Sequence, residues 1–216
     1  MTKWKYGDSW EKYPIEDGEV WQDPMSLSQI AVADLRDELP FEIQAEMVYM
    51  DSPWNKGNVN SFITKAGMDS YISSFEDFMN CLFGQIKKIS PEVCYLEIGK
   101  QHKEDFISRL ASIYSCVEDW EIRYYKKNPC YLVRGADYIT EADFTGLDDE
   151  VTPLKAIQAE KPSSVSDLCT GRGLTLLAAH KFGAKFYGTE LNKRRLAVAI
   201  DRAAKAGVFY EKSNIY

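Results

Sequence analysis

Short apolar segments alternate with longer segments of helical period along this 216-residue chain. An apolar run of four to eight residues is typical of a buried strand, whereas apolar residues three and four positions apart are typical of a helix with one buried face. These patterns predict strands at residues 19–22, 45–50, 92–98, 120–125, 130–133, 164–169 and 185–189, and helices at residues 71–83, 104–114, 153–159, 174–182 and 192–206. Strands that alternate with helices indicate an α/β protein.

One further helix is predicted after the first strand. Ser26 is a suitable N-cap residue, and Leu27, Ile30 and Leu35 follow it at helical spacing. Pro40 would stop this helix.

The remaining segments predict loops and turns. Residues 55–70 are rich in Gly, Asn, Ser and Lys, which predicts a loop, and the sequence Lys-Lys-Asn-Pro at 126–129 predicts the turn of a hairpin. No internal repeat or low-complexity tract divides the chain. We therefore expect a single domain spanning residues 1–216, in which residues 1–17 form a terminal arm packed on the edge of the sheet.

The composition excludes several classes of protein. No run of about 18 apolar residues is present, so we expect no membrane span, and the first ten residues lack the apolar core of a signal peptide. A cytoplasmic location follows as an expectation. The five cysteines form no C-x-x-C pair and the two histidines lie far apart, so we expect neither a disulfide framework nor a metal site.

The net charge of −7 is concentrated at the start of the chain. Residues 1–50 carry four basic and eleven acidic side chains, whereas the rest of the chain is balanced. Basic residues gather at 123–134 and 193–205, and residues 136–151 carry six acidic side chains and no basic one. This distribution argues against a protein that grips long stretches of DNA by itself.

A glycine-containing turn follows the strand at 164–169. It has the sequence Asp-Leu-Cys-Thr-Gly-Arg-Gly-Leu-Thr at 167–175, where a strand meets a helix, and Glu190 ends the next strand. Glycines at such a turn let a ligand approach the backbone N–H groups of the helix N-terminus, and the acidic side chain can bind two ribose hydroxyls. A dinucleotide fingerprint would need a small residue at position 176, where Leu176 stands. The alternative is a tight turn without a ligand.

A second turn follows the buried strand at 45–50 and reads Asp51-Ser52-Pro53-Trp54. The lone pair of an exocyclic amine on a nucleobase is delocalised into the ring, so the amine is a poor nucleophile. A carboxylate and a backbone carbonyl that accept both amine hydrogens would free this lone pair, and an adjacent aromatic ring could stack on a flipped base. The alternative is a strand-ending turn with a core tryptophan.

Together the two turns resemble the motifs of the amino-methyltransferases that act on DNA and on RNA adenosine. Asp51-Ser52-Pro53-Trp54 resembles the catalytic motif [DNS]-P-P-[YFW], with Ser52 in place of the first proline. Residues 167–175, followed by Glu190, resemble the S-adenosylmethionine-binding block D-P-F-x-G-x-G-T-T, with Cys169 in place of phenylalanine. The catalytic motif precedes the cofactor motif, as in the circularly permuted β-type enzymes.

This resemblance implies a Rossmann-like methyltransferase fold with a mostly parallel seven-stranded sheet and one antiparallel strand. It also implies that both turns, and with them Trp54 and Gly171, meet at one edge of the sheet. The implied catalytic residues are those of the first turn, Asp51 to Trp54. The implied cofactor-binding residues are Asp23, Asp51, Lys155, Asp167, Cys169, Thr170, Gly171, Gly173, Glu190 and Leu191.

The function implied by the resemblance is methylation of adenine N6 in DNA, as in a bacterial or phage modification system. Cytosine N4 methylation, RNA adenosine methylation and an inactive cofactor-binding partner subunit remain alternatives. Only about 30 residues, 134–161, lie where family members often carry a target-recognition domain. Recognition of DNA would then come from residues 55–70, from the basic hairpin, from a second copy of the chain in a homodimer, or from another subunit.

Overall fold

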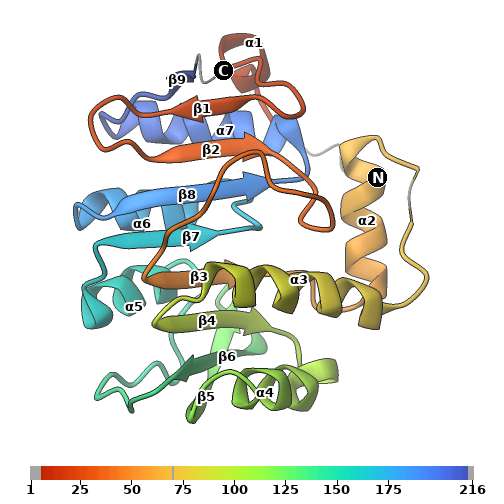
Figure 1. Cartoon of the computed structure of the whole chain (residues 1–216), viewed down its shortest axis with the longest axis vertical. Helices are drawn as coiled ribbons and strands as arrows, with labels where there is room; N and C mark the ends of the chain where they lie inside the picture. Colours follow the sequence, from red (N-terminus) through yellow and green to blue (C-terminus); the bar gives the residue numbers. More distant parts are fainter. Residues whose placement is uncertain (1–5, 70, 214–216) are drawn as a thin grey trace.

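The computed structural model describes residues 6–69 and 71–213. In this part of the chain, nine strands form one sheet in the order β5-β6-β4-β3-β7-β8-β2-β1-β9 (Figure 1). The strands are β1 (Val20–Gln22), β2 (Gln29–Val32), β3 (Met47–Asp51), β4 (Val93–Ile98), β5 (Cys116–Tyr124), β6 (Asn128–Ala136), β7 (Ser164–Asp167), β8 (Lys185–Glu190) and β9 (Glu211–Lys212).

Seven of the nine strands run in one direction, which confirms the mostly parallel α/β sheet. The central strands β2, β8, β7, β3 and β4 pair in parallel, and β6 inserts antiparallel between β4 and β5. The sheet is larger than the seven strands expected, because β1 and β9 extend it beyond β2, and β1 is a second antiparallel strand. The carboxyl ends of β3, β4, β7 and β8 meet at one edge.

Helices cover both faces of the sheet. Buried side chains of α2 (Lys56–Ala66), α3 (Phe75–Ile89) and α4 (Lys103–Ala111) belong to one apolar cluster, and those of α5 (Thr152–Glu160), α6 (Leu174–Lys181) and α7 (Lys193–Lys205) belong to the other. Because both faces are covered, the central strands are buried along most of their length, and every residue of β4 is buried. No helix in the described parts of the chain has the length and apolar character needed to span a bilayer.

The helix expected after Ser26 is wrong, because this segment contains β2. Ile30 pairs with Trp21 of β1 on one side and with Gly188 of β8 on the other. The hydroxyl of Ser26 donates to the Asp23 carboxylate inside the β1–β2 turn instead of capping a helix. A short apolar run fits a helix face or a fully buried strand equally well, and the sheet position decides here in favour of the strand.

The loop expected at residues 55–70 is also wrong, since most of it forms α2. Asn55 caps this helix, with its side chain accepting a hydrogen bond from the Asn58 backbone N–H. Val59 and Ile63, four positions apart, are the buried residues of this helix. Apart from Phe62 and Ala66, the rest of the helix consists of glycine and polar residues, which conceals its period in the sequence. Figure 1 shows α2 standing at the carboxyl edge of the sheet.

The N-terminal arm packs mainly on α7. Its short helix α1 (Ser9–Lys12) contacts α7, where the Ser9 hydroxyl donates to Asp201 over 3.3 Å. Tyr13 meets the ring of Trp21 in β1 edge-on, at a centroid distance of 6.3 Å. The expected contact with the edge region of the sheet is therefore only part of the packing, and residues 1–5 of the arm lie outside the described residues.

The acidic segment 136–151 runs along the outer side of β5. The Gly146 N–H donates to the Glu121 carbonyl over 2.8 Å, the Arg123 N–H donates to the Leu147 carbonyl over 2.7 Å, and the Asp149 N–H donates to the Arg123 carbonyl over 2.8 Å. These bonds occupy backbone groups of β5 that would otherwise face solvent.

Candidate active site

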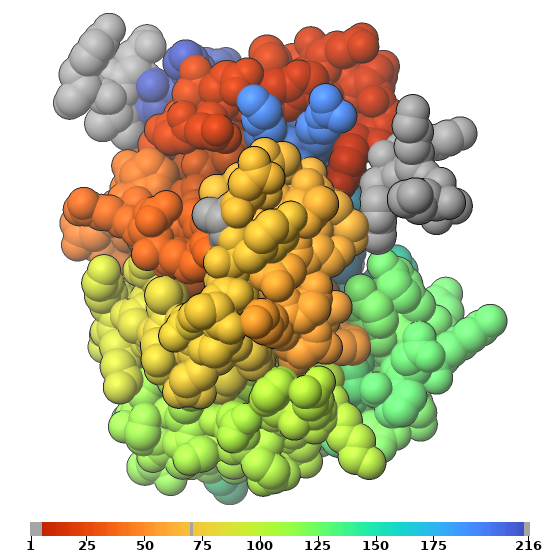
Figure 2. Space-filling model, turned by 90° about the vertical axis from the view of Figure 1, so that its right-hand side faces the viewer, coloured from red at the N-terminus to blue at the C-terminus, as the bar shows by residue number. Residues whose placement is uncertain are grey.

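A cavity opens at the carboxyl edge of the sheet, where the two turns singled out in the sequence converge. Its lining includes Asp51 at the end of β3 and Asp167, Cys169, Thr170 and Gly171 at the end of β7. The β5–β6 hairpin, the starts of α5 and α6, and one face of α7 from Arg195 to Arg202 also belong to the wall. Figure 2 faces this edge and shows the orange-to-yellow segment that contains α2 over its centre.

The first turn holds Asp51 and Trp54 together. The indole Nε1–H of Trp54 donates to Oδ1 of Asp51 over 3.2 Å, and the Trp54 backbone N–H donates to the Asn58 side chain over 3.3 Å. The Trp54 side chain lies against Gly99, the residue after β4, so closely that a Cβ at this glycine would come within 2.9 Å of Cε3. This packing fixes the indole beside the carboxylate.

An aromatic wall continues from Trp54 along the end of β5. The ring centroids of Trp54 and Tyr124 are 4.9 Å apart in an edge-on arrangement, and Tyr124 lies next to Tyr125 at 4.3 Å. Asp51, Ser52, Trp54 and Tyr124 also line a smaller depression beside the cavity. Ser52 is 2% exposed, and its hydroxyl has no hydrogen-bond partner in the described chain.

The second turn depends on two glycines with positive φ. Gly171 has φ 57° and Gly173 has φ 81°, a region that side-chain-bearing residues rarely adopt. At Gly173 a Cβ would also meet Cβ of Ala199 in α7 at 2.9 Å. Without side chains, the turn brings the backbone to the cavity wall at the start of α6.

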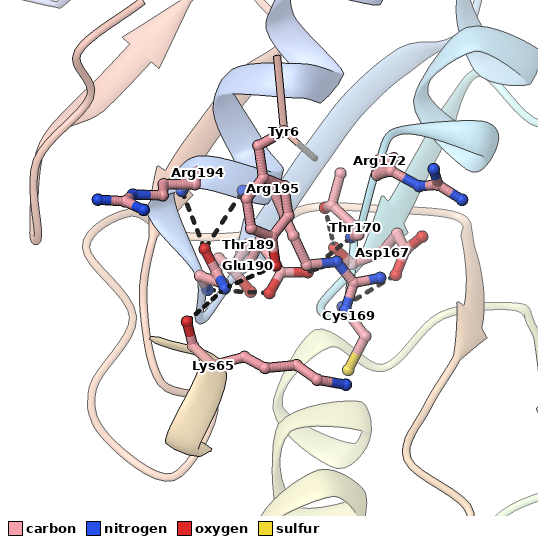
Figure 3. A network of polar contacts seen from close by, with 12 residues as sticks. Tyr6, Lys65, Asp167, Cys169, Thr170, Arg172, Thr189, Glu190, Arg194 and Arg195 are labelled. Carbon is pink, nitrogen blue, oxygen red and sulfur yellow. Dashed lines mark hydrogen bonds and ion pairs between the residues drawn. The ribbon is translucent and has the colours of Figure 1, made fainter. Parts of the chain in front are cut away.

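Glu190 joins the glycine turn to the end of β8 (Figure 3). Its Oε2 accepts the Gly171 N–H over 2.8 Å, and its Oε1 accepts the Asn192 N–H over 2.9 Å. The guanidinium of Arg195 lies 4.0 Å from the carboxylate and also lines the cavity. The carboxylate is thus fixed at the mouth of the glycine turn, in the position expected from the sequence.

Carboxyl groups in the cavity hold their protons unusually strongly. Enclosure by the surrounding protein raises the pKa of Asp51 to about 6, although the Trp54 indole and Arg195 oppose this shift. The Asp51 side chain remains accessible because it faces the cavity. Burial likewise raises the pKa of Asp167 to about 7 and that of Asp149 to about 6, and it raises the pKa of Glu97 well above its usual range.

Two residues expected in the cofactor site, Asp23 and Lys155, lie elsewhere. Asp23 follows β1, which is antiparallel, so it lies at the opposite edge of the sheet, where its carboxylate caps the Met25 and Ser26 N–H groups. The Lys155 ammonium donates to the Asp143 carbonyl and is absent from the cavity wall. Leu191 is absent from the wall of this cavity but lines two neighbouring depressions, both of which Asp34 also lines.

The structure adds residues that the sequence reasoning missed. Asp34 follows β2 at the carboxyl edge, next to Ala33, whose N–H donates to the Glu190 carbonyl over 3.2 Å. An apolar strand ending in an acid was the available signal for this position. Glu97 and Tyr124 gave no such signal, because their place in the cavity depends on the pairing of β4 and β5 with strands distant in sequence.

No protein-family model matches this sequence, and no curated protein matches it. Solved structures do. A provisionally named DNA modification methylase from Thermus thermophilus, complexed with S-adenosyl-L-methionine, aligns with a TM-score of 0.58 and 15% identity over 82% of this chain and 93% of that one. The chain shares its fold with this protein.

Two further structures extend the similarity. M1.HpyAVI, in its S-adenosylmethionine complex, aligns with a TM-score of 0.55 and 13% identity over 80% of this chain and 98% of that one. PvuII DNA methyltransferase, which is cytosine-N4-specific, aligns with a TM-score of 0.53 and 12% identity over 94% of this chain and 91% of that one. These alignments establish the Rossmann-like methyltransferase fold.

Proposed function

We propose that this chain is an S-adenosylmethionine-dependent DNA methyltransferase that methylates an exocyclic base amine, with adenine N6 as the target. The observation that carries the proposal is the convergence of Asp51 and the glycine turn on one cavity. The similarity of fold to the three methyltransferases supports it. The order of the two turns along the chain supports the circularly permuted arrangement.

The residues around the glycine turn fit the cofactor. Glu190 would hold the ribose hydroxyls, and Asp34, beside it at the end of β2, replaces Asp23 as the candidate contact to the adenine. Arg172 and Arg202 replace Lys155 as candidates for the methionine carboxylate. Both arginines line the cavity, and Nη1 of Arg202 donates to the Arg172 carbonyl over 2.7 Å. A guanidinium pair of this kind suits a carboxylate.

The first turn would prepare the target nitrogen. When bound, the cofactor supplies the methyl group. Asp51 and the carbonyl of Ser52 or Pro53 would accept the two amine hydrogens and free the nitrogen lone pair, while Trp54 stacks on the flipped base. Asp51 can take the proton that the amine loses as the new N–C bond forms. Most of the catalysis would come from this fixed geometry.

The alternatives to this function are methylation of another base, methylation of RNA instead of DNA, and a subunit with little or no activity. The similarity to PvuII DNA methyltransferase keeps cytosine N4 open, and RNA adenosine would use the same contacts. A weak or inactive subunit is a further candidate. Ser52 stands where a proline would make this turn more rigid, and its buried hydroxyl has no hydrogen-bond partner in the described chain to fix the turn instead. Target recognition would rest on α2, on the hairpin tip, on a second copy of the chain, or on another subunit.

One experiment separates these alternatives. The purified protein is incubated with radiolabelled S-adenosylmethionine and with duplex DNA or RNA, and the product is digested to nucleosides. Label on N6-methyldeoxyadenosine supports the proposal, and label on N4-methyldeoxycytidine redirects it to cytosine. An Asp51→Ala protein should bind cofactor and transfer nothing; wild-type transfer by this variant would refute the mechanism.

A further inference from the structure

Glu97 is a buried carboxyl group in the wall of the active-site cavity, and the mechanism above does not use it. It is 2% exposed and lies in β4, where it is paired in register with Asp51 of β3. The Tyr49 hydroxyl donates to its Oε1. Its Oε2 has no hydrogen-bond partner in the described chain. Burying a carboxyl oxygen without a hydrogen bond lowers the stability of the fold, which suggests that Glu97 has a function in the cavity.

The surroundings of Glu97 favour its neutral form. Burial raises its pKa, and the negative charge of Asp51 raises it further, since two neighbouring carboxylates repel each other. The charged or titratable groups that bear on it come from several elements: Tyr49 and Asp51 on β3, Asp167 on β7, Cys130 on β6, and Asp149 before α5. Three arginines, Arg172, Arg195 and Arg202, also line the cavity, but the groups that act most strongly on Glu97 are acidic, so a cation that entered beside Glu97 would relieve the repulsion.

We propose that Glu97 distinguishes the cofactor from its product by giving up its proton when a sulfonium enters the cavity. This inference rests on the proposed function. S-adenosylmethionine carries a positively charged sulfonium, whereas S-adenosylhomocysteine carries a neutral thioether. With the sulfonium present, the carboxyl group ionises and its proton passes to the buffer. With the thioether, Glu97 stays protonated. The charge on Glu97 therefore favours binding of the cofactor and release of the product.

The other acids of the cavity are less suited to this role. Asp167 already uses Oδ1 to accept the Cys169 N–H over 2.9 Å. Asp51 is accessible from the cavity and accepts the Trp54 indole N–H, and its pKa of about 6 leaves it ionised near neutrality. Glu97 alone among these three combines an unpartnered oxygen with a buried position.

The test is isothermal titration calorimetry of the whole protein at pH 8, in two buffers with different heats of ionisation. At this pH Asp51 and Asp149 are ionised and Asp167 is mostly ionised, whereas burial and the charge of Asp51 favour the protonated form of Glu97. We expect protons to be released when S-adenosylmethionine binds and close to none when S-adenosylhomocysteine binds. Affinity for the cofactor should rise with pH, while affinity for the product stays level.

A Glu97→Gln protein keeps the shape of the side chain and removes the proton. It should release no proton with either ligand, and its preference for cofactor over product should fall ~10-fold, equivalent to about 1.4 kcal/mol. A Tyr49→Phe protein is the matched control, because it loses the hydrogen bond to Glu97 but keeps the carboxyl and the proton release. A purely structural role for Glu97 would change stability without changing proton release.

Two results would overturn the inference: equal proton release with both ligands, or an unchanged ligand preference in the Glu97→Gln protein. If this variant does not fold, the comparison of the two ligands on the wild-type protein still decides. Absence of binding by both ligands would instead refute the proposed function. Failure of the inference and failure of the function therefore give different calorimetric results.

Discussion

Replacing Gly99 by alanine tests whether the position of Trp54 controls methyl transfer. The added Cβ would lie 2.9 Å from Cε3 and 3.2 Å from both Cβ and Cδ2 of Trp54, whereas ordinary contacts begin at 3.4 Å. The indole must therefore move by about 0.5 Å, and because its own Cβ is involved, a rotamer change alone does not relieve the clash. A shift of this size would lengthen the 3.2 Å hydrogen bond to Asp51 to about 3.7 Å, beyond the range of a hydrogen bond.

The expected result is a ~10-fold or greater fall in the rate of methyl transfer, since small displacements of positioning groups have large effects on rate. The assay is a single-turnover measurement with labelled cofactor and excess enzyme. Affinity for the cofactor should stay within about twofold, because the glycine turn is untouched. Gly84→Ala in α3 is the control: nothing lies within 4 Å of its added Cβ, and alanine in a helix should stabilise by roughly 0.5–1 kcal/mol. A Gly99→Ala enzyme with wild-type turnover would refute this account of the site.

Three further predictions concern the cavity and the hairpin beside it. Because the pKa of Asp51 is raised to about 6, its acceptor form is lost at a higher pH than usual, and the single-turnover rate should fall about tenfold per pH unit below 6; a level profile from pH 5 to 8 would contradict this. Asp167 has a folded-state pKa of about 7, above its value of 3.8 in a model peptide, so folding takes up a proton between these values. Its contribution to the free energy of unfolding should therefore fall by about 1.4 kcal/mol between pH 6 and pH 8, and urea unfolding of an Asp167→Asn protein should lack this component. Tyr125 and Lys126 have φ of 49° and 62° at the centre of the hairpin turn, a conformation suited to Asn-Gly, so the double change Tyr125→Asn/Lys126→Gly should raise the free energy of unfolding by about 1 kcal/mol; a lower melting temperature would count against the reasoning.

The central strands could be predicted from the sequence because burial on both faces leaves an unbroken apolar run. The strand β3, up to Asp51, and most of β4 have this pattern, and the glycine turn after β7 is specified by local conformation. The convergence of the two turns also followed, since carboxyl ends of parallel strands share an edge. These features depend on the residues themselves and on the direction of the strands.

Predictions from the sequence were wrong where they depended on the direction of a strand, which the sequence does not show. Asp23 and Asp34 both follow short apolar segments, and either could end a strand of the parallel set. Only the pairing shows that β1 runs antiparallel, which sends Asp23 to the far edge and leaves Asp34 near Glu190. The prediction for Lys155 was wrong for a related reason. Its neighbours in the sequence suggested a contact to the cofactor, but its ammonium group donates to the Asp143 carbonyl instead.

The remaining features that the sequence did not predict depend on contacts between residues far apart in the chain. In the sequence, Glu97 is an isolated acid in an apolar strand. Its place in the active-site cavity follows only from the pairing of β3 with β4, which puts Asp51 beside it. In α2, two buried positions among polar neighbours were too weak a pattern to predict a helix.

The acidic segment that lies along β5 also bears on how copies of this chain could associate. Because residues 146–149 already bond to Glu121 and Arg123 of the outermost strand, this end of the strand cannot accept a strand from another molecule. At the opposite margin, β9 has only two residues, Glu211 and Lys212, and the Lys212 ammonium is paired with Glu19. At these two places a second copy would therefore have to dock through helices or loops, and the amide protons of Arg123 and Asp149 should exchange slowly with deuterated water whether or not it is present.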